Sequence, residues 1–160
     1  MCGIIGIFHH NGLISSFDDG IIQMNKALQH RGPDDTGVYS DKSVSLGHQR
    51  LSIIDLSSDG HQPFVSENRN YVIVYNGELY NYKEIKLQIK EYPFRTKTDT
   101  EVILAAYIVF GEACLEMFNG MFSFAIWNKE KEELFIARDR VGIKHFTIQN
   151  KILVLCYPQR

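Results

Sequence analysis

The sequence has little of what marks an exported, membrane-bound or nucleic-acid-binding protein. Its 160 residues hold three cysteines, an odd and widely spaced set that does not suit a disulfide framework. The net charge is −2, without the basic stripe of a nucleic-acid-binding surface. No apolar run approaches the ~20 residues of a membrane span. The apolar opening over 3–8 is also too short for a signal peptide. We therefore expect a cytoplasmic protein with neither nucleic acid nor membrane as a partner.

What is present fits a single globular domain with its own core. Hydrophobic residues make up 44% of the chain and charged residues 22%, and we find no repeat or linker. Periodicity predicts strands over 3–8, 36–40, 43–49, 71–75, 122–127 and 134–137, and helices from about 16 to 30, over 80–91 and over 100–110. Asn76-Gly77 should end the fourth strand, and Thr98 to Glu101 should cap the last helix. Strands in runs with helices between them indicate an α+β fold with antiparallel sheets.

Cys2 is the most informative residue, because it stands directly behind the initiator Met1. Methionine aminopeptidases remove Met before a small residue, so we expect the mature chain to begin with Cys2. A free α-amine with a pKa of about 7.7–8.0 then lies beside a thiol with a pKa of about 8.5. This pairing supplies a nucleophile and its proton acceptor on one residue. The alternative is that Cys2 is simply a buried residue opening the first strand.

Seven segments of the sequence form a set of motifs that occur in a fixed order. In chain order they are CGI (2–4), RGPDD (31–35), QRLSIIDL (49–56), YNGELYNY (75–82), TDTE (98–101), NGMFSFA (119–125) and ARDRVGIK (137–144). Together they resemble the class II glutamine amidotransferase domain of glutamine-hydrolysing asparagine synthetases, which is an N-terminal-nucleophile hydrolase. The resemblance covers residues 2–144. It implies a four-layer αββα sandwich, with two antiparallel sheets inside and helices outside.

The resemblance also implies roles for the catalytic residues. Cys2 would attack the side-chain amide of glutamine, with its own α-amine as general base. The side-chain amide of Asn76 and the backbone N–H of Gly77 would form the oxyanion hole. The alternative for Asn76-Gly77 is a plain hairpin turn.

Further residues would bind the α-carboxylate and α-ammonium of glutamine. The planar fork of Arg50 suits the carboxylate, although a surface ion pair is the alternative. Glu78 and Asp99 resemble the family's ammonium-binding residues, while Asp99 also suits the first turn of a helix. Residues Leu51, Ile53 and Ile54 would flank the substrate.

No cofactor is expected for glutamine hydrolysis itself. The six histidines lack zinc-ligand spacing, so we expect no metal site. In this family ammonia passes to a synthetase domain that uses ATP and Mg, and we expect no such domain in these 160 residues. Two alternatives stay open: the glutaminase domain of another class II amidotransferase, serving a sugar or phosphoribosyl acceptor, and an inactive truncated remnant.

The resemblance stops after Lys144, which divides the chain into a domain over 2–144 and a tail over 145–160. Restoring one C before a CAT codon for His145 would turn the following codons into Pro-Phe-Tyr-Tyr, the run expected there. We therefore hypothesise that residues 145–160 are an out-of-frame tail and that the C-terminal part of the fold is missing.

Overall fold

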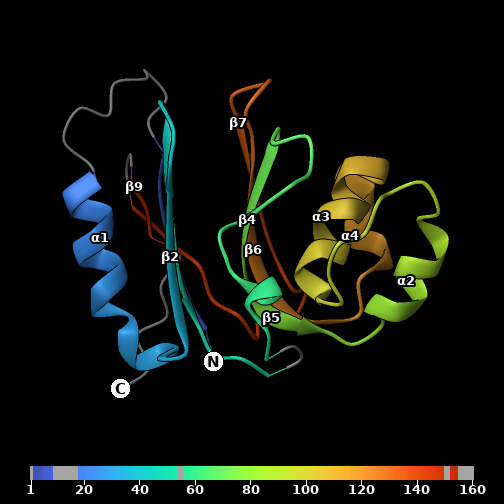
Figure 1. The fold of residues 1–160 in the computed structure, drawn as a ribbon, viewed down its shortest axis with the longest axis horizontal. Helices are drawn as coiled ribbons and strands as arrows, with labels where there is room; N and C mark the ends of the chain where they lie inside the picture. The colour runs from blue at the N-terminus through green and yellow to red at the C-terminus, as the bar shows by residue number, and fades with distance from the viewer. Residues whose placement is uncertain (1, 9–17, 54–55, 150–151, 155–160) are drawn as a thin grey trace.

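The structure is a computed structural model that describes residues 2–8, 18–53, 56–149 and 152–154 (Figure 1). Two antiparallel sheets face each other. The first has the strand order β1–β3–β2, with β1 (Gly3–Phe8), β2 (Asp35–Ser40) and β3 (Val44–Arg50). The second has the order β4–β5–β6–β7, with β4 (Phe64–Val65), β5 (Tyr71–Leu79), β6 (Gly120–Asn128) and β7 (Glu133–Arg138). A small hairpin of β8 (Thr147–Gln149) and β9 (Ile152–Val154) brings β9 beside β1.

Helices cover the outer faces of both sheets (Figure 1). On the first sheet lies α1 (Asp18–Ala27), and on the second lie α2 (Tyr82–Gln88), α3 (Asp99–Phe110) and α4 (Cys114–Met117). Short 3-10 helices occur at Gln29–Arg31, Ser58–Gly60 and Gly111–Ala113. This order of layers confirms the predicted αββα sandwich.

Apolar side chains fill each space between neighbouring layers. Ile5 and Ile7 of β1 pack against Ile21 and Leu28 at α1. Alternate residues of the same strands face the other way, since successive side chains point to opposite sides of a sheet. The space between the two sheets is therefore filled by a second cluster: Ile4, Val44, Leu46, Val72, Val74, Ala125 and Trp127. A third and larger cluster joins the second sheet to α2, α3 and α4.

The predicted end of the fourth strand is wrong. Strand β5 continues through Asn76 and Gly77 to Leu79, because β6 pairs with it along its whole length. Neither residue has a positive φ. Gly77 is required for another reason: a Cβ there would lie 2.4 Å from the carbonyl oxygen of Met121 on β6.

The other predicted elements occur, with small shifts at their ends. Helix α3 begins where expected, with Thr98 accepting a hydrogen bond from the Glu101 N–H at 3.3 Å, and it ends at Gly111 with φ +60°. Helix α2 is shorter than predicted and ends at Gln88. The start predicted near Ser16 lies outside the described residues.

Candidate functional site

An open edge of β5 forms one wall of the candidate site. Strand β4 is only two residues long, and its pairing with β5 ends at Ile73. In an antiparallel ladder the N–H and C=O of every second residue point to the same side, so Tyr75, Gly77 and Leu79 share the edge beyond β4. The Tyr75 N–H donates to Gln62 Oε1 at 2.7 Å, and the Leu79 N–H donates to Asp99 Oδ2 at 3.1 Å. Between them, the N–H of Gly77 points to the same edge.

Cys2 approaches this edge from the first sheet. The pairing of Gly3 with Gln49 brings Cys2 next to the end of β3. The Leu51 N–H donates to Cys2 Sγ at 3.3 Å, and Sγ lies 3.6 Å from the Leu51 carbonyl oxygen. Burial raises the pKa of the Cys2 thiol, and the Leu51 hydrogen bond and the charge of Arg50 oppose that rise only in part. A thiol in this setting is protonated at neutral pH and needs a base before it can attack.

A small cavity of about 60 Å³ joins Cys2 to the open edge of β5. Six of the residues predicted from the sequence line it: Cys2, Arg50, Leu51, Ile53, Gly77 and Asp99. Five further lining residues were not predicted: Gly60, Gln62, Tyr75, Thr98 and Thr100. Asn76 and Glu78 flank Gly77 on β5 but are not among the lining residues, and Ile54 lies outside the described residues.

Arg50 is buried and lines this cavity. Its Nη1 donates to the Ser57 carbonyl oxygen at 2.7 Å, which ties the following loop to β3. A Cβ at position 60 would lie 2.0 Å from Arg50 Nη2, so any residue other than glycine there would displace the guanidinium from this position. A buried guanidinium lining a cavity is suited to a carboxylate ligand, because its donors form a rigid fork.

Asp99, which also lines the cavity, is held in place by α3 and β5. It is the first residue of α3, and its Oδ2 accepts from the Tyr75 hydroxyl at 2.8 Å and from the Leu79 N–H. Burial raises the pKa of the Asp99 carboxyl, and these two hydrogen bonds oppose the rise. The carboxylate thereby fixes α3 against the strand that carries Asn76 and Gly77.

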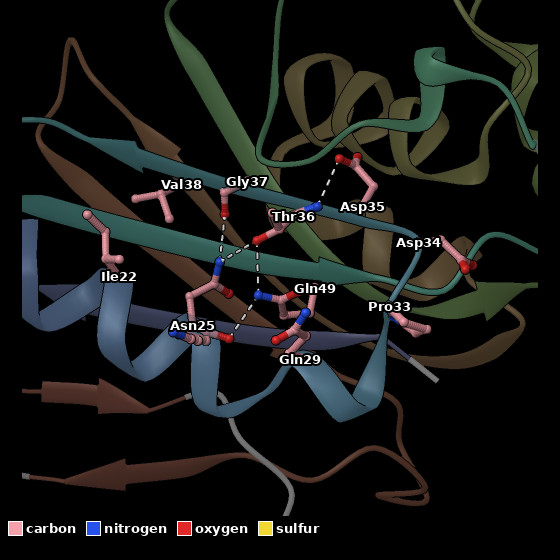
Figure 2. A pocket seen from close by; sticks show the side chains of 11 residues that line it. Ile22, Asn25, Gln29, Pro33, Asp34, Asp35, Thr36, Gly37, Val38 and Gln49 are labelled. Carbon is pink, nitrogen blue, oxygen red and sulfur yellow. Dashed lines mark hydrogen bonds between the residues drawn. The ribbon is translucent and has the colours of Figure 1, made fainter.

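The first sheet is fixed in turn by Asn25 of α1. Figure 2 shows the Asn25 side chain reaching toward Thr36 and Gly37 of β2; Nδ2 donates to Thr36 Oγ1 at 3.1 Å and to the Gly37 carbonyl at 3.2 Å. Gln49 Nε2 donates to the Asn25 carbonyl oxygen at 2.9 Å. The hollow of about 670 Å³ beside them contains none of the predicted site residues.

The described residues contain no group of three or more potential metal ligands. No helix in this part of the chain is long and apolar enough to cross a membrane.

The chain is similar to known glutamine amidotransferase domains and asparagine synthetases. The sequence profile of a family described as a glutamine amidotransferase domain matches residues 1–155. Among curated proteins, asparagine synthetase [glutamine-hydrolyzing] 1 of Bacillus subtilis is 45% identical over 148 residues, which is 90% of this chain and 23% of the relative. Asparagine synthetase B [glutamine-hydrolyzing] of Escherichia coli is 36% identical, over 89% of this chain and 26% of the relative.

A solved structure has the same fold. Glutamine phosphoribosylpyrophosphate amidotransferase from B. subtilis, complexed with ADP and GMP, superposes with a TM-score of 0.73 at 23% identity, covering 96% of this chain and 41% of that one. Compared with the two synthetases named above, the chain spans about a quarter of their length. Since the family profile covers nearly all of these residues, the chain belongs to the glutamine amidotransferase domain family.

Proposed function

We propose that this domain hydrolyses glutamine to glutamate and ammonia, with Cys2 as the nucleophile after removal of Met1. The observation that supports this most directly is one cavity lined by the Cys2 thiol, the Arg50 guanidinium and the Asp99 carboxyl, beside the edge of β5 to which the Gly77 N–H points. The cavity thus combines a nucleophile, a cation, an anion and a candidate oxyanion donor.

The proposed reaction begins with proton transfer from the Cys2 thiol to its own α-amine. The thiolate then attacks the side-chain amide carbon of glutamine, and the carbonyl oxygen becomes an oxyanion that the Asn76 side-chain amide and the Gly77 N–H stabilise. The ammonium formed on Cys2 returns its proton to the departing nitrogen, which leaves as ammonia. Water, activated by the same amine, hydrolyses the thioester and releases glutamate.

The same proposal assigns the rest of the site to substrate binding. Arg50 would bind the α-carboxylate of glutamine through its fork, while Asp99 and Glu78 would bind the α-ammonium. Three residues would flank the substrate: Leu51, Ile53 and Ile54. None of these steps needs a cofactor.

The fate of the ammonia is a further part of the proposal. The curated relatives are named as glutamine-hydrolysing asparagine synthetases, so we propose that the ammonia serves asparagine synthesis in the cytoplasm. A synthetase domain using ATP and Mg would accept it, and such a domain would lie outside these 160 residues. The out-of-frame origin of residues 145–160 stays a prediction, tested by the nucleotide sequence around codon 145.

A glutaminase assay on the purified chain tests the proposed function. Glutamate release is measured for the wild-type chain and for Cys2→Ala, with Cys114→Ala as the matched control. Cys114 is also a free cysteine, but it is fully buried in the core at α4, and burial raises its pKa to about 12. We expect Cys2→Ala to lose activity and Cys114→Ala to retain it. Intact-mass spectrometry showing Met1 retained in an active sample would refute the amine as base.

A further inference from the structure

His48 is a buried histidine that the proposed mechanism does not use. It lies on β3 two residues before Arg50, and it is fully buried. Its Nε2 lies 3.1 Å from the Tyr75 carbonyl oxygen. A carbonyl oxygen can only accept, so Nε2 carries the hydrogen and donates. Burial lowers the pKa of His48 to about 4, so the ring is neutral at neutral pH.

The carbonyl that His48 binds belongs to the open edge of β5. Tyr75 lies beyond the end of β4, so its backbone groups on this side have no strand to pair with. Gln62 accepts from the Tyr75 N–H, and His48 donates to the Tyr75 carbonyl. At Tyr75, the residue before Asn76, two side chains therefore make the backbone hydrogen bonds that a neighbouring strand would otherwise make. The peptide between Tyr75 and Asn76 is held by the His48 contact.

This contact also joins the two halves of the candidate site. His48 pairs with Ile4 of β1, the strand that begins just after Cys2, and it shares β3 with Arg50. Its partner, Tyr75, shares β5 with Asn76 and Gly77. The hydrogen bond therefore crosses from the sheet of the nucleophile to the strand of the oxyanion donors.

The other nitrogen of the ring shows that core packing alone does not account for a histidine here. Among the described residues, His48 Nδ1 has no hydrogen-bond partner. The residues before it on the same face of β3, Val44 and Leu46, are apolar and equally buried. An apolar residue at 48 would avoid the cost of a buried, unpartnered nitrogen, but it would leave the Tyr75 carbonyl without a donor.

We propose that His48 is a positioning residue for glutamine hydrolysis, which holds the Tyr75–Asn76 peptide and thereby sets the oxyanion donors against Cys2. This inference rests on the proposed function. It assigns His48 no contact with substrate and no proton transfer.

Two substitutions at His48 test the inference. His48→Phe keeps a ring but removes the donor, whereas the side-chain amide of His48→Gln can still donate to the Tyr75 carbonyl. We expect His48→Phe to lower kcat at least about tenfold with KM within about twofold of wild type, because the oxyanion exists only transiently. His48→Gln should recover most of that loss. The matched control is Leu46→Ala, which disturbs the same face of β3 and should lower the Tm while leaving kcat unchanged.

Hydrogen exchange provides a readout that does not depend on activity. In His48→Phe the amides of Tyr75, which Gln62 accepts from, and of Asn76, which lies in the ladder with β6, should exchange at least about tenfold faster than in wild type, while those of 72–74 stay protected. The role of His48 would be overturned by unchanged exchange at these two amides in His48→Phe. It would also be overturned if His48→Phe had the same kcat as Leu46→Ala. A folded wild-type chain that does not hydrolyse glutamine would instead overturn the proposed function, and the exchange experiment would still decide the role of His48.

Discussion

The space between the two sheets has two ends, and the same strands build both from different residues. At one end the facing side chains are apolar and buried: Val44, Leu46, Val72, Val74, Ala125 and Trp127. At the other end they are polar and buried: His48, Arg50, Asn76 and Ser123. Two strands change character between successive inward-facing residues, from Leu46 to His48 on β3 and from Val74 to Asn76 on β5, whereas β1 keeps the apolar Ile4 opposite His48. On β6, Ser123 pairs with Asn76 and Ala125 pairs with Val74.

The difference shows how one layer provides both a core and a site. At the apolar end the backbone is satisfied by continuous ladders, so side chains need only pack. At the polar end β4 stops, and β5 has an edge whose backbone groups bond to Gln62, His48 and Asp99. We therefore expect substitutions at the polar end to change activity and substitutions at the apolar end to change stability.

The first prediction concerns the polar end and has the largest expected effect. Asn76→Ala should lower kcat by roughly 100- to 1,000-fold while KM changes little, because a lost oxyanion donor matters only in the transition state. Steady-state glutaminase kinetics measure both values. Ser123→Ala is the control, since Ser123 Oγ donates to the Asn76 carbonyl at 3.5 Å but carries no proposed role. Equal losses in the two variants would contradict the assignment of the Asn76 amide.

The second prediction concerns the apolar end. Leu46→Ala should lower the free energy of unfolding by about 3–4 kcal/mol, because it removes a fully buried side chain between two rigid sheets. The kcat of the folded fraction should stay at the wild-type value. Urea denaturation and glutaminase assays on the same preparation test this. A fall in kcat without a loss of stability would break the division between the two ends.

The third prediction concerns the pH dependence of stability. The pKa of His48 is lowered from 6.5 to about 4, chiefly by burial; the hydrogen bond to Tyr75 and the charge of Asp35 oppose this fall, while Arg50 and His61 add to it. Below pH 6.5 the unfolded chain binds a proton at His48 that the folded chain does not bind until about pH 4. This histidine should therefore reduce stability by up to about 3 kcal/mol as the pH falls through that window.

Urea denaturation at several pH values measures this effect, with His48→Gln as the reference. The variant should lose the part of the slope that lies between about pH 6.5 and pH 4, because it has no group that titrates there. Identical slopes for the two chains would show that His48 does not take up a proton on unfolding.

The sequence predicted the layers and most of the cavity, but it did not reveal how the open edge is built. Alternating strands and the cap at Thr98 are local signals, and both were confirmed. Asn76-Gly77 suggested a turn because both residues favour turns, yet pairing with β6 outweighs that local preference. Neither Gln62 nor His48 was predicted as a site residue. Their contacts with Tyr75 span 13 and 27 residues, so no local pattern indicates them. The spacing of two residues between His48 and Arg50 was the one available signal that both face the same side.

The last and smallest expected effect separates charge from shape at Arg50. Arg50→Lys keeps the positive charge but loses the planar fork that can bind both oxygens of a carboxylate. We expect KM for glutamine to rise about tenfold while kcat changes little, since the carboxylate is bound equally in the ground and transition states. Arg50 also donates to the backbone carbonyl of Ser57, so the substitution affects the loop as well as the substrate site.

Ser57→Ala is the control for the loop. It removes the Ser57 hydroxyl that accepts from the Asp59 N–H at 3.2 Å, and so loosens the loop, but it keeps the guanidinium and the carbonyl that Arg50 binds. A rise in KM for Ser57→Ala as large as that for Arg50→Lys would assign the effect to the loop. A fall in kcat at unchanged KM in Arg50→Lys would instead place Arg50 with the transition-state donors, and the polar end would then contain a second group that acts on the reacting amide.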